Sequence, residues 1–287
     1  MFKLKSKHVV SGMGLLLLFT GLLCAQNTNR SKFRQLKQEF ATPNVYRTAS
    51  GAPGHEYWQQ RADYRIDVTL DDRNQKIDGQ EVITYYNQSP DRLEYIWLQL
   101  DQNMRALDSD ARAISTLTIE DKESFRSIQR LHNEFDGGFK IESVTDELGT
   151  DLAYIVVKTM MRIDLPRPLE PGERFVFRIA WWYNINDRKK DGGRSGYEYF
   201  EKDDNYLYTI AQFYPRMAVY NEVEGWQHKQ FLGAGEFTLP FGNFEVSLTV
   251  PSDHVVGATG VLQNREEVLT PRQIGRASCR ERVFRTV

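Results

Sequence analysis

The most regular feature of the chain is an alternation of apolar and polar residues that begins near residue 57. Apolar side chains occupy every second position at 64–70, polar residues follow at 71–74, and a second alternating stretch runs over 82–86. Successive side chains of a strand point to opposite faces of a sheet, so this pattern predicts a β-hairpin with one buried face.

Later segments continue the two-residue period, and Gly- and Pro-rich turn signals separate them. At 93–100 both alternating sets are largely apolar, which is typical of a strand between two layers. Mixed charge at helical spacing occurs at 119–135, and a short helix is also predicted at 32–40. The pattern therefore predicts a mainly β, antiparallel β-sandwich or saddle. Further strands are expected at 139–144, 153–161, 174–183, 205–211 and 244–250, with turns at 136–138, 166–168, 170–173, 191–193 and 240–243.

The N-terminal end has the composition of a secretory signal peptide. Three lysines precede an apolar run at 9–23, and small and polar residues follow it. The run is shorter than a stable membrane span requires, so we expect cleavage and export to the periplasm or the cell exterior. Cys24 offers the alternative of a lipoprotein anchor.

The C-terminal end, 274–287, holds four arginines and no apolar periodicity. Its first ten residues match one reading frame of a common sequencing adapter, and we interpret it as an artefact. The expected organisation is a signal peptide at 1–25, a polar linker at 26–56, a β domain at 57–264, the start of a connection at 265–273, and the artefact.

Charge and cysteine content narrow the possible partners. The whole chain has 37 basic and 39 acidic residues. Without the three lysines of the signal peptide and the four arginines and one glutamate of the tail, 30 basic and 38 acidic residues remain. This negative balance argues against nucleic acid as a partner. Both cysteines lie in the two ends, so the expected domain has neither a disulfide nor a cysteine metal site.

Catalytic and metal motifs are missing from the sequence. His55 begins a segment like a zinc-protease helix, but Gln59 stands where the second histidine is needed. The chain has no nucleophile elbow, and neither glycine-rich phosphate motif occurs. Acidic pairs such as Glu198 with Glu201 suit a glycosidase in principle, but solvated acids are far commoner.

Aromatic residues are densest at 196–201 and 207–217, and this density favours a position in the core. Gln212, Tyr214 and Arg216 alternate at a strand end, an arrangement in which their side chains can point together into a cleft.

Four pieces of sequence give the chain a family resemblance. They are YRIDVTL at 64–70 with IDG at 77–79, PLEPGE at 168–173, TIAQFYPR at 209–216, and VPS at 250–252 with VGATGVL at 256–262. Their order resembles that in the N-terminal β-saddle domain of aminopeptidase N type zinc metallopeptidases (gluzincins), most of all the exported bacterial branch. The resemblance covers 57–264.

The resemblance implies a parent protein with a thermolysin-like catalytic domain. That domain would carry His-Glu-x-x-His, a distant Glu ligand and a Gly-x-Met-Glu-Asn loop, and none of these motifs occurs in this chain. The parent would hydrolyse peptides from the N-terminus with a zinc-activated water, a Glu base and an electrophilic Tyr. We expect this chain to be a fragment that ends before the catalytic domain, binds no zinc itself and is inactive alone.

The resemblance also implies a role for two residues of this chain. Gln212 would lie at the rim of the substrate pocket. Tyr214 stands where many members carry an acid that holds the amino terminus of the substrate, a departure that bears on strict aminopeptidase specificity. The alternative is that both are buried strand-end residues of the saddle.

Two other functions fit the same sequence. A non-catalytic β-sandwich would bind glycans through exposed aromatics such as Trp181, Trp182 or Tyr197. The third hypothesis is a scaffold protein that derives from an enzyme and whose full-length form has lost the zinc motif.

Overall fold

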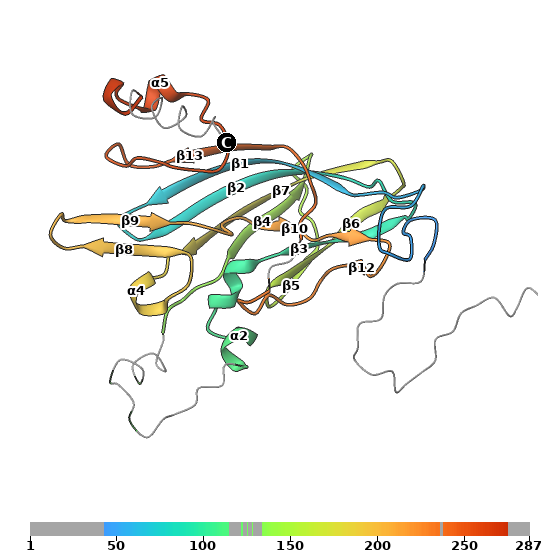
Figure 1. Cartoon of the computed structure of the whole chain (residues 1–287), viewed down its shortest axis with the longest axis horizontal. Coiled ribbons are helices and arrows are strands. Elements are labelled where there is room, and N and C mark those ends of the chain that lie inside the picture. The colour runs from blue at the N-terminus through green and yellow to red at the C-terminus, as the bar shows by residue number, and fades with distance from the viewer. Residues whose placement is uncertain are drawn as a thin grey trace, which may run out of the picture.

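The computed structural model describes residues 43–114, 122, 125, 128, 134–235 and 238–274. Two sheets form the body of the protein, together with two short hairpins (Figure 1). The strands are β1 (Arg61–Asp71), β2 (Lys76–Tyr86), β3 (Leu93–Gln99), β4 (Lys140–Asp146), β5 (Tyr154–Val157), β6 (Met160–Leu169), β7 (Arg174–Asn184), β8 (Gly196–Phe200), β9 (Asn205–Thr209), β10 (Arg216–Met217), β11 (Tyr220–Asn221), β12 (Gly225–Trp226) and β13 (Phe244–Thr249).

The first sheet has the strand order β13-β1-β2-β7-β4, and the second has the order β10-β3-β6-β5. The hairpins are β8–β9 and β11–β12. Buried apolar side chains from both main sheets join one continuous core, which confirms the predicted mainly β sandwich. In the described ranges the strands are accompanied by four short helices: η2 (Asp101–Arg105), α2 (Asp110–Ala113), α4 (Arg188–Asp191) and α5 (Arg265–Val268).

The predicted first hairpin is confirmed as β1–β2. Its strands pair in an unbroken antiparallel register that ends with Asp71 opposite Lys76. The Asp71 carboxylate accepts hydrogen bonds from the backbone N–H groups of Arg73 and Asn74, each at 3.0 Å. Aspartate is a strong turn former because its side chain can bond to the backbone in this way.

The core reaches its largest side chain at Trp181 on β7, which is 1% exposed. Its ring meets Phe139 edge-on, with 5.4 Å between ring centroids. Gly79 on β2 faces the same indole, and a Cβ atom placed there would lie 2.3 Å from the ring. Only glycine therefore allows the two strands to keep this register beneath the tryptophan.

Two predictions about the second sheet are wrong. The expected strand at 153–161 is a hairpin of β5 and β6, reversed at Lys158, whose φ of 56° is left-handed. The expected turn at 166–168 lies inside β6. The register of β6 against β3 shifts there, since Leu93 pairs with Leu169 whereas Tyr95 pairs with Asp164. Proline cannot donate to a ladder, and this irregularity accommodates both prolines.

The strand expected at 244–250 is confirmed as β13, but its pairing differs from the antiparallel expectation. It lies parallel to β1, with Tyr64 opposite Phe244 and Thr69 opposite Thr249. All six residues of β13 are exposed, and within the described part of the chain β1 is its only pairing partner. β13 is thus a solvent-exposed edge strand of the first sheet.

Several predicted segments fall outside the described residues. The helix predicted at 32–40 does so entirely, as do the signal peptide and most of the helix at 119–135. The described residues 43–56 lie against the β domain, where the Tyr46 and Trp58 rings meet edge-on at 6.5 Å. No helix in the described ranges has the length and apolar character that crossing a membrane requires.

Candidate functional site

The two predicted site residues lie in the irregular segment between β9 and β10. Gln212 has a φ of 53°, a left-handed conformation that is uncommon for a residue other than glycine. The residue is half-buried, and no hydrogen bond joins its side-chain amide to another described residue. Such strained backbone persists only where its surroundings hold it, and it occurs often at binding sites.

The surroundings that hold Gln212 come from η2 and the segment before β8. The buried amide of Gln102 donates to the carbonyls of Ala211 at 2.9 Å and of Gln212 at 3.1 Å. Arg105 donates to the other end of the same amide at 3.0 Å. The Ser195 hydroxyl exchanges hydrogen bonds with the backbone N–H and carbonyl of Ala211. Side chains distant in sequence therefore fix this backbone.

Tyr214 is anchored in a different way, through its ring. The ring packs edge-on against Tyr64 of β1 at 5.5 Å and against Phe244 of β13 at 6.1 Å. Burial raises the pKa of the Tyr214 hydroxyl to about 12, so it is a neutral donor at physiological pH. No hydrogen bond to that hydroxyl comes from the described residues.

A buried ion pair supports the same segment from below. The Arg216 Nε atom donates to Oδ2 of Asp101 at 2.7 Å, and Nη2 lies 2.7 Å from the same oxygen. Asp101 is 1% exposed, so neither charge is well screened by water. The pair fixes the start of β10 relative to η2, and with it the chain that carries Gln212 and Tyr214.

Sequence reasoning missed a second acidic residue near Tyr214. Glu81 on β2 is 1% exposed, and neither carboxyl oxygen has a hydrogen-bond partner among the described residues. Burial raises the pKa of this carboxyl well above its ordinary value of 4.5. A signal was present in the alternation, because Glu81 stands on the inward face between Ile77 and Ile83. An acid at such a position is an exception to the usual exposure of glutamate.

The two predicted site residues carry neutral side chains. Gln212 and Tyr214 offer a neutral amide and a neutral hydroxyl, which can donate hydrogen bonds to a ligand but cannot activate a nucleophile. Among the described residues no three His, Cys, Asp or Glu side chains come together to hold a metal ion. The part of the chain that the structure describes therefore offers no set of ligands that fits a zinc ion.

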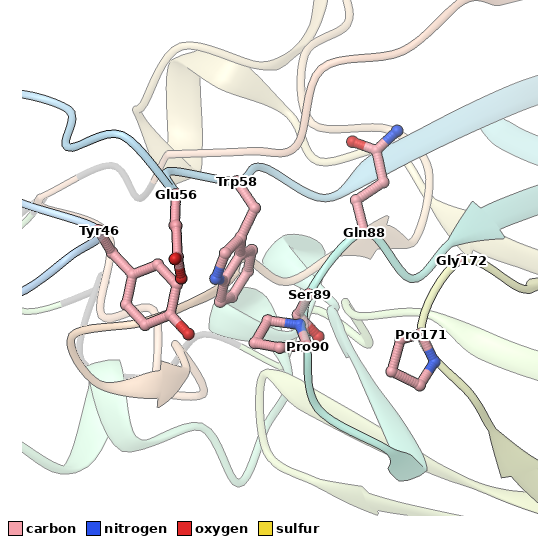
Figure 2. Close-up of a pocket in the computed structure, with 8 residues that line it drawn as sticks. All are labelled: Tyr46, Glu56, Trp58, Gln88, Ser89, Pro90, Pro171 and Gly172. Atoms are coloured by element: carbon pink, nitrogen blue, oxygen red, sulfur yellow. The ribbon is translucent and has the colours of Figure 1, made fainter.

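A surface pocket of about 460 Å³ lies elsewhere, at the edge where the N-terminal segment meets the β domain (Figure 2). Trp58 forms one wall and stacks on Tyr220 with 5.7 Å between centroids. Pro90 and Pro171 form another part of the lining, and Glu56 is the acidic group of the pocket. Neither predicted site residue lines it, so the pocket and the Gln212 segment are separate features.

The residues suggested for glycan binding do not form one exposed platform. Trp181 is in the core, which contradicts its proposed exposure. Trp182 is half-buried, and the ammonium of Lys76 lies 4.3 Å from its ring centroid. Tyr197 is half-buried on β8.

The aromatic segment at 196–201 was expected in the core, but Tyr199 and Phe200 are exposed on the β8–β9 hairpin.

No protein-family model matches the chain, and no curated protein matches it. Among solved structures, one similar chain is a two-domain M1 zinc metallopeptidase mutant bound to L-tryptophan, with a TM-score of 0.38 and 16% identity. A second is an M1 zinc metallopeptidase mutant from Deinococcus radiodurans bound to a Tyr-Ser-Ala substrate, with a TM-score of 0.36 and 16% identity. Each match covers 74% of this chain and 38% of the other. At these scores the similarity does not assign the chain to that family.

Proposed function

We propose that this chain is the N-terminal β domain of an exported zinc metallopeptidase of the aminopeptidase type, and that it contributes to peptide binding. The parent protein hydrolyses peptides from their amino terminus, and its zinc and catalytic groups belong to a domain outside this sequence. The chain alone is inactive. The sequence resemblance over 57–264 supports this proposal, and the geometry at Gln212 supports the binding role.

The observation that carries the binding role is the held, left-handed backbone at Gln212. Two buried side chains, Gln102 and Ser195, and the half-buried Arg105 contribute to the hydrogen-bond network around that segment. A purely structural glutamine would not need a strained backbone with an unpaired amide, because a turn there is less strained with glycine. The arrangement fits an amide held in advance for a ligand, which lowers the entropy lost on binding.

Tyr214 refines the proposed substrate preference. A carboxylate at this position would attract the charged ammonium of a peptide, whereas a neutral phenol offers only a hydrogen bond. Burial keeps Tyr214 neutral across the physiological range. The parent enzyme is therefore less strict in its requirement for a free amino terminus than a relative with an acid there.

Zinc supplies Lewis-acid chemistry in enzymes of this type. In this proposal the chain contributes by positioning the peptide.

Sequencing the source DNA beyond the codon for Gln273 tests the assignment. The expected result is an open frame that encodes His-Glu-x-x-His followed by a glutamate ligand. In the encoded full-length enzyme, Gln212→Ala should raise KM for aminoacyl anilides about tenfold with little change in kcat, as loss of one hydrogen bond to the substrate predicts. The matched control is Gln263→Ala, an exposed glutamine.

Two results would contradict the proposal. One is a genomic frame that encodes 274–287 and then stops. The other is hydrolysis of an aminoacyl anilide by the purified chain in the presence of zinc, abolished by a chelator.

A further inference from the structure

The hairpin of β8 and β9 forms an arm that belongs to neither main sheet. It extends from one end of the sandwich (Figure 1). Its register places Tyr197 opposite Tyr208 and Tyr199 opposite Tyr206. Directly opposed residues share a face, as do residues two apart in one strand. One face of the arm therefore carries four tyrosines, defined here as the tyrosine face.

The rings of the tyrosine face form a connected array. Tyr206 lies at its centre, 4.9 Å from Tyr199, 5.9 Å from Tyr197 and 6.0 Å from Tyr208, measured between centroids. Tyr199 and Tyr206 are each 38% exposed. The array thus presents a π surface to solvent near the end of the arm.

The base of the arm is held firmly enough to keep this surface in place. The Tyr208 hydroxyl donates to Oε1 of Gln75 in the β1–β2 turn at 2.7 Å. The backbone N–H of Tyr197 donates to the carbonyl of Asn186 at 2.9 Å, and the Asn186 amide donates to the carbonyl of Ser195 at 3.0 Å. These contacts hold the Tyr208 ring and the start of β8 in place before any ligand arrives, which favours binding.

Some aromatic rings elsewhere in the described residues have one of the protein's own cations over them. Arg61 lies over Tyr86 at 5.0 Å, and Arg162 lies over Tyr95 at 4.1 Å. On the opposite face of the arm, Lys189 lies 5.2 Å from the centroid of the Phe200 ring. The cation–π contacts of the described residues include none with the four rings of the tyrosine face.

The turn at the end of the arm adds negative charge. Glu201, Asp203 and Asp204 are exposed, and Lys202 is the only cation between them. The Asp204 carboxylate accepts a hydrogen bond from the Tyr199 hydroxyl at 2.8 Å, which places an acid at the margin of the tyrosine face. Exposed π surface beside carboxylates is complementary to cationic groups, because the ring face and the acid attract the same charge.

We propose that the tyrosine face binds a basic peptide segment, with Arg or Lys side chains over the rings and their charges near the acidic turn. The planar guanidinium group stacks on aromatic faces better than an ammonium does, so arginine is the preferred residue. The proposal goes beyond the metallopeptidase assignment, because it needs neither zinc nor a catalytic domain.

Fluorescence anisotropy with a labelled peptide of alternating Gly and Arg tests the proposal on the purified chain. Binding is expected to weaken at least tenfold when citrulline, the neutral isostere, replaces arginine, and to weaken with added salt. Tyr206→Ala should reduce affinity about fivefold or more, whereas Tyr206→Phe should retain most of it, because the ring rather than the hydroxyl meets the cation. Tyr154→Ala, at an exposed tyrosine of β5, is the matched control and should leave binding unchanged.

A second variant separates a loss of binding from misfolding of the arm. Glu201→Gln combined with Asp203→Asn leaves the rings in place, and it should weaken arginine-peptide binding and flatten its salt dependence. Equal binding of the citrulline peptide would overturn the proposal. So would tyrosine-dependent binding of cellohexaose without binding of the arginine peptide, since the face would then be a glycan platform. Absence of binding to either probe would also overturn it.

Discussion

Replacing the buried Glu81 with methionine should stabilise the protein. In its protonated form the carboxyl leaves both oxygens without a hydrogen-bond partner among the described residues. A buried polar group without a partner costs about 1–3 kcal/mol. Methionine is similarly long and unbranched, and it replaces polar atoms by atoms that suit the core. The expected gain at pH 5 is therefore about 1–3 kcal/mol in the free energy of unfolding.

The gain should increase with pH. Because the pKa of Glu81 is raised in the folded state, the folded protein keeps a proton that the unfolded chain loses above its ordinary pKa of 4.5. Stability of the natural protein therefore falls as pH rises from there towards the raised pKa, by up to about 1.4 kcal/mol per pH unit from this group. Glu81→Met removes that dependence.

Urea unfolding of both proteins at pH 5 and pH 8 provides the measurement. Glu245→Met, at an exposed glutamate of β13, is the control and should change stability by less than about 0.5 kcal/mol at both pH values. A Glu81→Met protein that is less stable than the natural one would refute the reasoning. A difference that stays constant between pH 5 and pH 8 would refute the protonation argument specifically.

Three further substitutions test the packing around the site, each by the urea midpoint. Arg216→Met should cost about 3–5 kcal/mol because it removes the Arg216 cation that lies 2.7 Å from the buried Asp101 carboxylate, and adding Asp101→Leu should recover much of the loss. Gly79→Ala should cost about 1–3 kcal/mol because its Cβ would overlap an indole ring, whereas Gly257→Ala, with open space around it, should be nearly neutral. Gln212→Gly should be about 1 kcal/mol more stable than Gln212→Ala, since only glycine relieves the left-handed backbone; equal stabilities would show that the backbone there is unstrained.

The alternation of residues was sufficient to predict the sandwich and its first hairpin, because burial of one face imposes a period of two on the sequence. The alternation did not predict the backbone conformation where contacts between distant residues determine it. The prolines at 166 and 168 indicated a turn, but a register shift in β6 accommodates them within a strand. The reversal at Lys158 carries neither glycine nor proline, so no local signal separated β5 from β6.

The sequence pointed to Gln212 and Tyr214 through a family motif, but it did not indicate which residues pack against them. The contacts that hold them come from residues about 110 and 150 positions earlier, Gln102 and Tyr64, and such pairings have no local signature. Dense aromatics were expected to mark the core, since buried rings contribute most to stability. On the β8–β9 arm they instead face solvent, which composition alone does not distinguish from burial.

The parallel pairing of β1 with β13 has a consequence for how the protein is made. The two strands meet across a separation of 180 residues, as the hydrogen bond from Asn243 to Asp63 shows. A ribosome adding about 5–20 residues per second needs roughly 10–40 s to synthesise that interval. During that time β2 can cover one edge of β1, while the other edge has no partner. Arg65 and Asp67 place charges along β1, and such charges discourage pairing with a neighbouring nascent chain until β13 emerges.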